Sequence, residues 1–295
     1  MYQWLSQSVV FNTGRIKPTL RLKFRRRKVH TRVIAGVAIG LALLVIPALA
    51  GDLEIGAKYY AGNDFAKAMR YYQKAAAQGN ASAQFSVGLM HAEGHGVVQD
   101  HGLAIYWYGK AAVQGHLDAQ DHLGAMYESG TGVARNYKRA MDWYMKAAAQ
   151  GFAPAQASVG AMYDNGHGVA QDYQQAVAWY AKAAAQGNPM GQNNLGTMYE
   201  LGTGVAKDYP QAAFWYAKAA AQSYAPAQFN LAIIYKIGRG VNRDNIEAYK
   251  WMVVASANRY EDAERGLAIM EPKMTRNQIA AGQRRASEWL TAHKK

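Results

Sequence analysis

The sequence predicts an all-α fold, an α/α superhelix in which antiparallel helix hairpins stack into a right-handed solenoid. Two markers recur every 36 residues: a tryptophan and a closely spaced pair of glycines. Between the markers, apolar residues lie three or four positions apart, as on one face of a helix. A fixed period of roughly 20–50 residues is typical of repeat architectures, whose units bury their apolar faces only against one another. The tryptophans are Trp107, Trp143, Trp179, Trp215 and Trp251.

The first element is a basic segment, residues 1–32, followed by an uncharged apolar stretch, residues 33–50. This order is typical of an export signal. Eighteen apolar residues are just enough to span a bilayer as an uncleaved anchor. Pro47, which we expect to break the helix, and the small residues Ala48 and Ala50 favour cleavage as a signal peptide instead. Both alternatives stay open, and both predict that residues 51–295 lie outside the cytoplasm, in the periplasm or anchored at the inner membrane.

The net charge of +13 is concentrated in that N-terminal part, which holds nine Lys and Arg and no acidic residue. From residue 51 onward, 24 basic residues accompany 20 acidic ones. This balance gives no general affinity for phosphate backbones, so nucleic acid is not an expected partner. The chain has no cysteine, and the fold therefore needs neither disulfides nor thiolate metal ligands.

Residues 51–79 predict a degenerate capping hairpin, because they end in "DFAKAMRYYQKAAAQG" but have "AGN" where later units have Gly-x-Gly-Val. Five units follow, each predicted to be a helix, a glycine turn and a second helix. In the first helix, Ala155, Val159 and Met162 form an apolar stripe that contains Gly160. A glycine within a helix costs about 1 kcal/mol against alanine, so its recurrence indicates a closely approaching partner helix. The units are 80–115, 116–151, 152–187, 188–223 and 224–259.

The second helix of each unit is predicted to begin at a capping Asp or Asn. In three units a Gln or Glu three residues later resembles a capping box. The helix is expected to bury Trp179, Tyr180 and the alanines beside them, and Gly187 can end it in the left-handed conformation. The cap residues are Asp100, Asn136, Asp172, Asp208 and Asp244, and the box partners are Gln175, Gln211 and Glu247.

Residues 260–295 predict C-terminal capping helices. The last of them is expected to start at Thr275 with Gln278 as its box partner. Its apolar residues, among them Ile279, Ala286 and Trp289, would cover the open end of the array.

The combination "AQ…LG.MYE.GTGV..DY..A..WY.KAAAQG", found with small changes in residues 191–223 and in the units on either side, closely resembles the Sel-one-like repeat (SLR) family. That family is a branch of the tetratricopeptide-type (TPR-like) helical repeats. The resemblance implies a solenoid that acts as an adaptor in protein complexes, including bacterial envelope complexes.

The sequence offers no catalytic residue, cofactor site or metal site. It has no Gly-x-Ser-x-Gly elbow, and its glycine turns lack the remaining residues of dinucleotide-binding and P-loop motifs. His91 and His95 are four apart, but no third ligand is indicated, so we expect no metal there. The chain is therefore not expected to be an enzyme.

When the five units are aligned with one another, some positions of the first helix differ from unit to unit. These variable positions form the candidate binding strip. If the first helices line the concave face, as in related helical repeats, these side chains would point toward a protein or peptide. We therefore predict an exported protein–protein interaction scaffold, with a glycan- or cell-wall-binding protein as the alternative. The strip comprises Phe85, Ser86, Asp121, His122, Ser158, Asn193, Asn194, Phe229 and Asn230.

Overall fold

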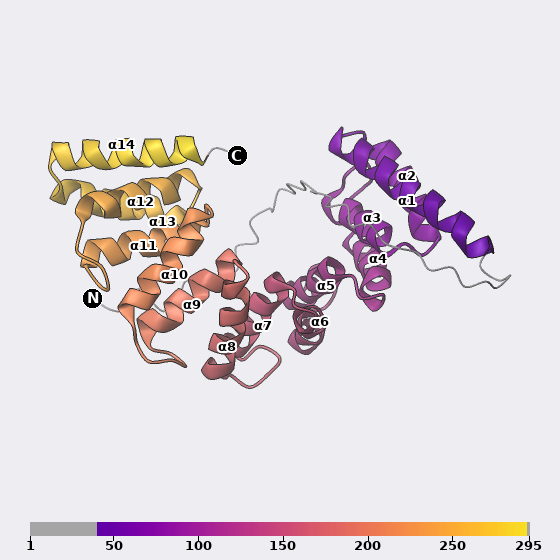
Figure 1. The fold of residues 1–295 in the computed structure, drawn as a ribbon, viewed down its shortest axis with the longest axis horizontal. Coiled ribbons are helices and arrows are strands. Elements are labelled where there is room, and N and C mark those ends of the chain that lie inside the picture. Colours follow the sequence, from indigo (N-terminus) through magenta and orange to yellow (C-terminus); the bar gives the residue numbers. More distant parts are fainter. Residues whose placement is uncertain (1–39, 294–295) are drawn as a thin grey trace. The chain divides into compact units, whose positions relative to one another are not determined.

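The computed structural model describes residues 40–293, and for residues 40–50 it describes the backbone alone. Within this range the regular structure is entirely helical (Figure 1). The α-helices are α1 Gly40–Ala61, α2 Phe65–Ala77, α3 Ala81–Glu93, α4 His101–Val113, α5 Leu117–Ser129, α6 Tyr137–Ala149, α7 Ala153–Asn165, α8 Tyr173–Ala185, α9 Pro189–Leu201, α10 Tyr209–Ala221, α11 Ala225–Ile237, α12 Asn245–Ala257, α13 Glu261–Met270 and α14 Arg276–Ala292. A short 3-10 helix, Glu271–Lys273, joins the last two.

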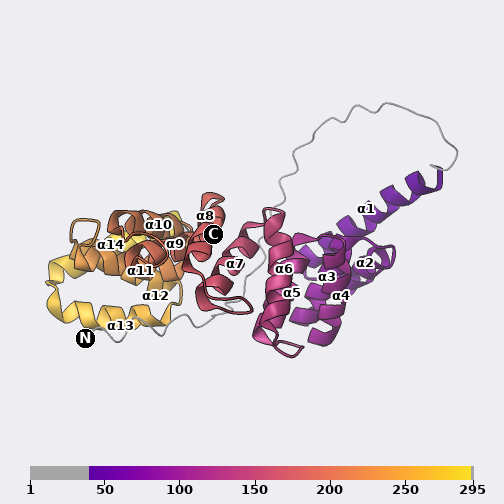
Figure 2. The same ribbon diagram turned by 90° about the horizontal axis from the view of Figure 1, so that it is seen from below.

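The helices from α3 to α12 form five consecutive hairpins. Each of these helices has 13 residues, and equivalent helices start 36 residues apart. The two helices of a hairpin pack together, and the second helix of each hairpin packs against the first helix of the next. Figures 1 and 2 both show the hairpins following one another in chain order. The predicted all-α solenoid of antiparallel hairpins is confirmed.

Side-chain caps begin the second helices where the sequence predicts them. Asp172, for example, accepts hydrogen bonds from the backbone N–H groups of Gln174 and Gln175, both at 3.0 Å. These bonds satisfy N–H groups in the first turn that have no partner within the helix. The other predicted caps accept equivalent bonds: Asp100, Asn136, Asp208 and Asp244.

The predicted capping boxes of these second helices are wrong, because the reciprocal bond is not formed in any of the three units. Glu247 shows a physical reason: its carboxylate binds Lys250 at 3.1 Å and Arg285 at 2.6 Å. Charged donors hold a carboxylate more strongly than a neutral backbone N–H does. At the start of α14, in contrast, Thr275 and Gln278 form the complete box that the sequence predicts.

The glycine pair makes both the turn and a contact with the preceding hairpin. Gly166 ends α7 with a left-handed backbone, and Gly168 has a φ of 71°. A Cβ on Gly168 would lie 2.5 Å from the carbonyl oxygen of Tyr137, the first residue of α6. Only glycine combines this conformation with so close an approach. The turn therefore fixes one hairpin on the previous one.

In four of the five hairpins from α3 to α12, a tyrosine fills the core to a greater extent than the neighbouring tryptophan. Tyr180 is fully buried, whereas Trp179 is half-buried and packs with one side against the preceding hairpin. The ammonium group of Lys182 lies 3.8 Å from the centre of the Trp179 ring. Such a cation over an aromatic face stabilises an exposed ring. The expected burial of the tryptophans is complete only at Trp251.

In the hairpins from α3 to α10, a glycine within the first helix makes room for that tyrosine, whereas the last hairpin has Ala232 and Met252 at these positions. A Cβ on Gly160 would lie 2.6 Å from the ring of Tyr180, and Gly124 has the same relation to Tyr144. The predicted close approach at these glycines is confirmed, and the approaching group is an aromatic ring. Gly56 and Tyr72 repeat the contact between α1 and α2, in the predicted capping hairpin.

A buried glutamine joins three helices in every unit. Gln156 on α7 donates from Nε2 to the carbonyl oxygen of Ala148 on α6 at 3.3 Å. Its Oε1 accepts from Nε2 of Gln186, at the end of α8, at 2.7 Å. The same arrangement recurs at Gln84, Gln120, Gln192 and Gln228. A fully satisfied buried amide of this kind fixes how successive hairpins pack.

At the N-terminal side, the predicted export segment lies largely outside the described side chains. Residues 33–39 are not described, and residues 40–50 belong to α1. The expectation that Pro47 breaks the helix is wrong, since α1 runs through it to Ala61. Proline removes one helical hydrogen bond but does not prevent the following residues from continuing the helix. Among the described helices, none is long and apolar enough to cross a membrane.

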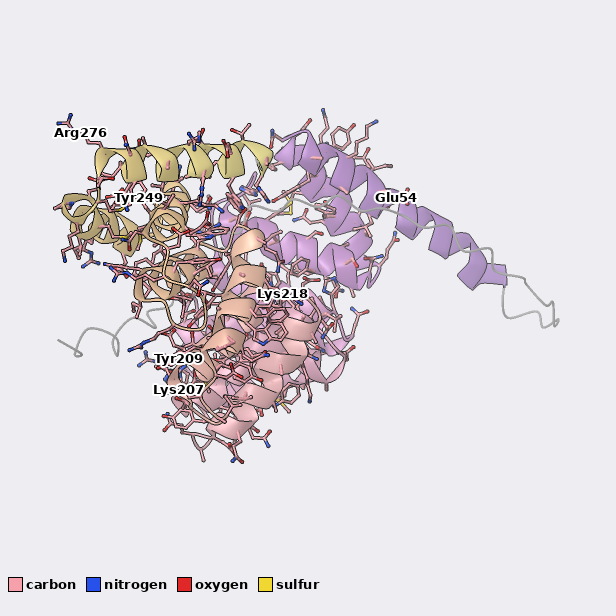
Figure 3. All side chains as sticks on the ribbon, turned by 60° about the vertical axis from the view of Figure 1, so that its left-hand side comes forward. Glu54, Lys207, Tyr209, Lys218, Tyr249 and Arg276 are labelled. Carbon is pink, nitrogen blue, oxygen red and sulfur yellow. The ribbon has the colours of Figure 1, made fainter. Side chains whose placement is uncertain are left out.

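At the other end, α13 and α14 pack against α12 of the last hairpin. Ala286 is fully buried, and Trp289 contacts Trp251 with ring centres 5.5 Å apart. Figure 3 shows Tyr249 beneath α14. The Tyr249 hydroxyl donates to Glu271 at 2.7 Å. Apolar surface that a further repeat would bury is thus covered by the terminal helix.

Candidate functional site

The residues predicted as a binding strip all lie on the first helices of their hairpins. Asn193 is buried and the other eight are half-buried, so they differ from a fully solvated helix face. Polar atoms with so little exposure normally need partners. The structure places them as follows: Phe85 and Ser86 on α3, Asp121 and His122 on α5, Ser158 on α7, Asn193 and Asn194 on α9, and Phe229 and Asn230 on α11.

Three of the predicted residues form one hydrogen-bonded network. Asn193 donates from Nδ2 to Oδ1 of Asn194 at 3.1 Å. Its own Oδ1 accepts from Nδ2 of Asn230 at 2.9 Å. This network links the first helices α9 and α11 and still leaves Asn194 and Asn230 half-exposed.

A second group of predicted residues is aromatic. The ring of Phe85 lies edge-on to His122, with ring centres 5.2 Å apart, and stacks on His116 at 4.9 Å. Burial lowers the pKa of His116, which favours its neutral form. The ring of Phe229 contacts Tyr260 in a tilted arrangement, with ring centres 5.1 Å apart. These phenylalanines pack adjacent hairpins together, which is a structural role.

Two of the predicted residues, Ser158 and Asn194, are joined to carboxylates through tyrosine hydroxyls, whereas the Ser86 hydroxyl donates to the carbonyl oxygen of Ser82 at 2.9 Å. Tyr144 donates to Glu128 at 2.8 Å, and its hydroxyl is also within hydrogen-bonding reach of Ser158 on the next hairpin. Tyr180 donates to Asp164 at 3.3 Å. Its hydroxyl likewise reaches Asn194 on the next hairpin.

The third such tyrosine is Tyr216, whose hydroxyl donates to Glu200 at 2.8 Å and lies 3.0 Å from the Thr197 hydroxyl. Glu128, Asp164 and Glu200 are 36 residues apart on α5, α7 and α9. We call these three carboxylates the acidic row. All three are half-buried.

The surroundings of the acidic row make the three tyrosine hydroxyls harder to deprotonate. Burial and the adjacent carboxylate raise the pKa of Tyr144, Tyr180 and Tyr216 well above its usual value. Each hydroxyl therefore remains a donor at neutral pH. Burial also raises the pKa of Glu128 and Asp164, since a charged carboxylate is costly where solvent is excluded.

Asp121 adds a fourth carboxylate to this face. It lies seven residues before Glu128 on α5, a spacing that places both on one side of the helix. Its Oδ1 is buried and has no hydrogen-bond partner among the described residues. Burial, followed by repulsion from Asp118 and Glu128, raises the pKa of Asp121 to about 7.

The acidic row was not predicted, because acidic residues were expected mainly at caps or on exposed helix positions. The signal was present in the sequence: Met-Tyr followed by Glu, Asp and Glu at positions 128, 164 and 200. The pairing with the core tyrosine depends on two helices meeting in space, which the spacing alone does not reveal.

The repeats also identify the family. The profile of the Sel1 repeat matches residues 52–80, 81–116, 117–152, 153–188, 189–224 and 225–258. The chain belongs to the Sel1 repeat family. Its fold generally serves protein–protein interaction, and the profile counts the hairpin of residues 52–80 as a Sel1 repeat as well.

Two solved Sel1 repeat structures are similar over most of this chain. One is c5321 of uropathogenic Escherichia coli, described as a protective antigen displaying an SLR fold, with 34% identity and a TM-score of 0.69. The alignment covers 84% of this chain but only 56% of the c5321 chain. The other is a Sel1 repeat protein from Oxalobacter formigenes, with 31% identity, a TM-score of 0.70, and coverage of 83% and 97% respectively. No curated protein matches the sequence.

Chemically, the face built by the first helices of these Sel1 repeats can accept hydrogen bonds and bind cations. Its groups are amides, carboxylates and tyrosine hydroxyls, spread over several repeats. Within residues 40–293, no cluster of three or more His, Asp or Glu side chains could hold a metal ion.

Proposed function

We propose that the protein is an exported, non-enzymatic scaffold that holds a protein or peptide on the face formed by its first helices. The observation that carries this proposal is the row of partly exposed amides and carboxylates that continues across consecutive Sel1 repeats. Contacts distributed over several repeats suit an extended partner. We further propose that it serves a bacterial envelope complex.

Export is supported by the basic segment and apolar stretch that precede the repeats. N-terminal sequencing of the purified protein distinguishes the two processing alternatives. A start at Gly51 would show cleavage after Ala50, and an intact basic segment would show a membrane anchor.

The scaffold function is tested by affinity capture from native envelopes with the full-length chain as bait. We expect a protein partner whose capture falls in the variant Asn194→Ala/Asn230→Ala, which alters only the first-helix face. The matched control is Lys138→Ala/Gln174→Ala, two exposed positions on second helices. Circular dichroism shows whether both variants fold. Failure to retain any protein, or equal retention by both variants, would contradict the proposal.

A glycan is the alternative ligand, because neighbouring amides such as Asn194 and Asn230 are suited to bind sugar hydroxyls. The corresponding test is binding to purified peptidoglycan. Loss of that binding in the variant His122→Ala/Asn194→Ala/Asn230→Ala, without loss of a protein partner, would favour the glycan.

A further inference from the structure

The acidic row carries negative charge that the fold does not neutralise. None of its three carboxylates forms an ion pair with a lysine, arginine or histidine of residues 51–293. A tyrosine hydroxyl holds one oxygen of each, which orients the group but leaves its charge in place. Partly buried carboxylates without a cation cost stability, and groups of this kind cluster at functional sites.

Asp121 gives an independent indication of a missing ligand. Its buried Oδ1 has no partner among the described residues, although a buried polar atom without one is uncommon. The charged groups that act on Asp121 are Asp118 and Glu128, both acidic. A cation bound at this face would therefore offset the repulsion that Asp118 and Glu128 exert on Asp121.

We infer that the acidic row and Asp121 bind a lysine- or arginine-bearing segment of a partner protein, in an extended conformation, with one basic side chain at each repeat. This inference rests on the proposed function, because it names the chemistry of the partner on the same face. Arginine is the better fit, since its guanidinium can bind the remaining carboxylate oxygen with two N–H groups.

The geometry also sets the spacing of the basic residues. The first helices α7 and α9 contact one another, and packed helices lie about 8–10 Å apart. An extended chain of the polyproline II type advances about 3.1 Å per residue with three residues per turn, so basic side chains three positions apart lie on one side of it and about 9 Å from one another. The partner segment should therefore carry its basic residues at every third position.

The repeats on either side of the acidic row have no carboxylate at the equivalent position, which limits the length of the partner segment. At the N-terminal side the equivalent position is Ala92, and at the C-terminal side it is Lys236. Burial and the nearby Lys273 lower the pKa of Lys236, so this end of the face repels a further cation. Three basic residues are matched, and a fourth one beyond Glu200 would gain nothing.

The test uses the full-length chain and a fluorescent peptide with three arginines at every third position, separated by serine and glycine. Fluorescence anisotropy measures its affinity. The row variant is Glu128→Gln/Asp164→Asn/Glu200→Gln, which keeps an oxygen to accept each tyrosine hydrogen bond. The matched control is Glu54→Gln/Asp142→Asn/Glu264→Gln, which removes the same charge at exposed positions elsewhere (Glu54 is labelled in Figure 3).

We expect the unchanged chain to bind this peptide with an affinity that falls as salt rises, and to bind a peptide with glutamate in place of arginine far more weakly. The row variant should lose about tenfold or more in affinity, whereas the control variant should remain within about twofold. Equal affinity of the row variant and the unchanged chain would overturn the inference. Displacement of the peptide by calcium ions at micromolar concentration would also overturn it, because the row would then be a metal site.

The outcome is distinguishable from failure of the scaffold function. If the chain captures a protein partner through Asn194 and Asn230 but that partner binds the row variant equally well, the scaffold stands and the inference on basic partners fails. If the peptide binds as expected but no protein is captured, the scaffold function fails instead.

Discussion

The tyrosine of each second helix occupies the same buried position in several hairpins, but its hydroxyl group has different partners. The Tyr216 hydroxyl bonds to Glu200 and lies close to the Thr197 hydroxyl. The Tyr108 hydroxyl is buried without a partner among the described residues, because the equivalent of Glu200 in its hairpin is Ala92. The same hydroxyl group therefore stabilises one hairpin and costs desolvation in another.

Replacing each tyrosine with phenylalanine separates these two situations. Tyr216→Phe should lower the free energy of unfolding by about 1–2 kcal/mol, because it removes a hydrogen bond to a charged acceptor. Tyr108→Phe should leave it unchanged or raise it by up to about 1 kcal/mol, because it removes only an unsatisfied hydroxyl. Urea titration followed by circular dichroism measures both. Equal losses in the two variants would show that the hydroxyl partners do not matter.

Asp121 makes the stability depend on pH. Its pKa is about 7 in the folded protein, raised by burial and then by Asp118 and Glu128, and returns to about 4 in the unfolded chain. Between these values the folded state binds more protons than the unfolded state, so its stability falls as the pH rises from about 4 to 7. Asp121→Asn removes this loss and should be more stable than the unchanged chain at pH 8, by up to about 4 kcal/mol. Urea titrations of both proteins at a series of pH values measure this difference in the free energy of unfolding.

The difference between Asp121→Asn and the unchanged chain should shrink toward zero near pH 4. A difference that does not change with pH would contradict the raised pKa of Asp121.

At the scale of the helices, the hairpins from α3 to α10 depend on a glycine and an aromatic ring that fit together. Helix propensity alone favours alanine over glycine by about 1 kcal/mol. Gly160 nevertheless lies in the middle of α7, because the ring of Tyr180 occupies the place of its Cβ. Close packing thus prevails over propensity at this position.

Two glycine-to-alanine variants test that balance. Gly160→Ala should destabilise the protein by about 1–3 kcal/mol, because the added methyl overlaps a ring that cannot move within a filled core. Gly109→Ala, on α4, meets no atom within 4 Å and should stabilise the protein by up to about 1 kcal/mol. Thermal unfolding followed by circular dichroism compares the variants. This explanation would be wrong if both substitutions stabilised the protein or both destabilised it.

The period and the capping residues predict the helices closely because they are local signals. The left-handed turn at Gly166 and the cap at Asp172 depend on a few neighbouring residues, and both are confirmed. Trp179 and Tyr180 are adjacent, and the sequence does not show which of the two apolar rings points into the core. That choice depends on the shape of the space opened by Gly160, which exists only when the two helices meet.

The candidate site was predictable only in part for the same reason. The positions that vary between units lie on the first helices, as do Ser158 and Asn194, whose contacts cross to the tyrosine of the preceding hairpin. Asp164 was missed because its relation to the Tyr180 hydroxyl crosses from one helix to another, 16 positions along the chain.

At the scale of the whole molecule, stability comes from contacts that are repeated between neighbouring hairpins. Gln156 and Gln192 make equivalent bonds to the preceding hairpin, at Ala148 and Ala184. Because each hairpin contacts mainly its neighbours, the energy of the array is approximately a sum of hairpin and interface contributions. The chain should therefore tolerate the loss of one complete period but not of half a period.

Deletion of residues 153–188 removes α7 and α8 and joins Phe152 to Pro189, which preserves the register. In the shortened chain, Gln192 can reach the carbonyl of Ala148 in place of Ala184, so the interface is restored. We expect a folded helical protein whose urea m-value is about a seventh smaller, in proportion to the surface lost on unfolding. Deletion of residues 153–170 alone leaves α8 without the helix that covers its apolar face. This second variant should unfold without a sharp transition or aggregate, as measured by urea titration and light scattering. Similar behaviour of the two deletions would show that the hairpin is not the unit from which this molecule is assembled.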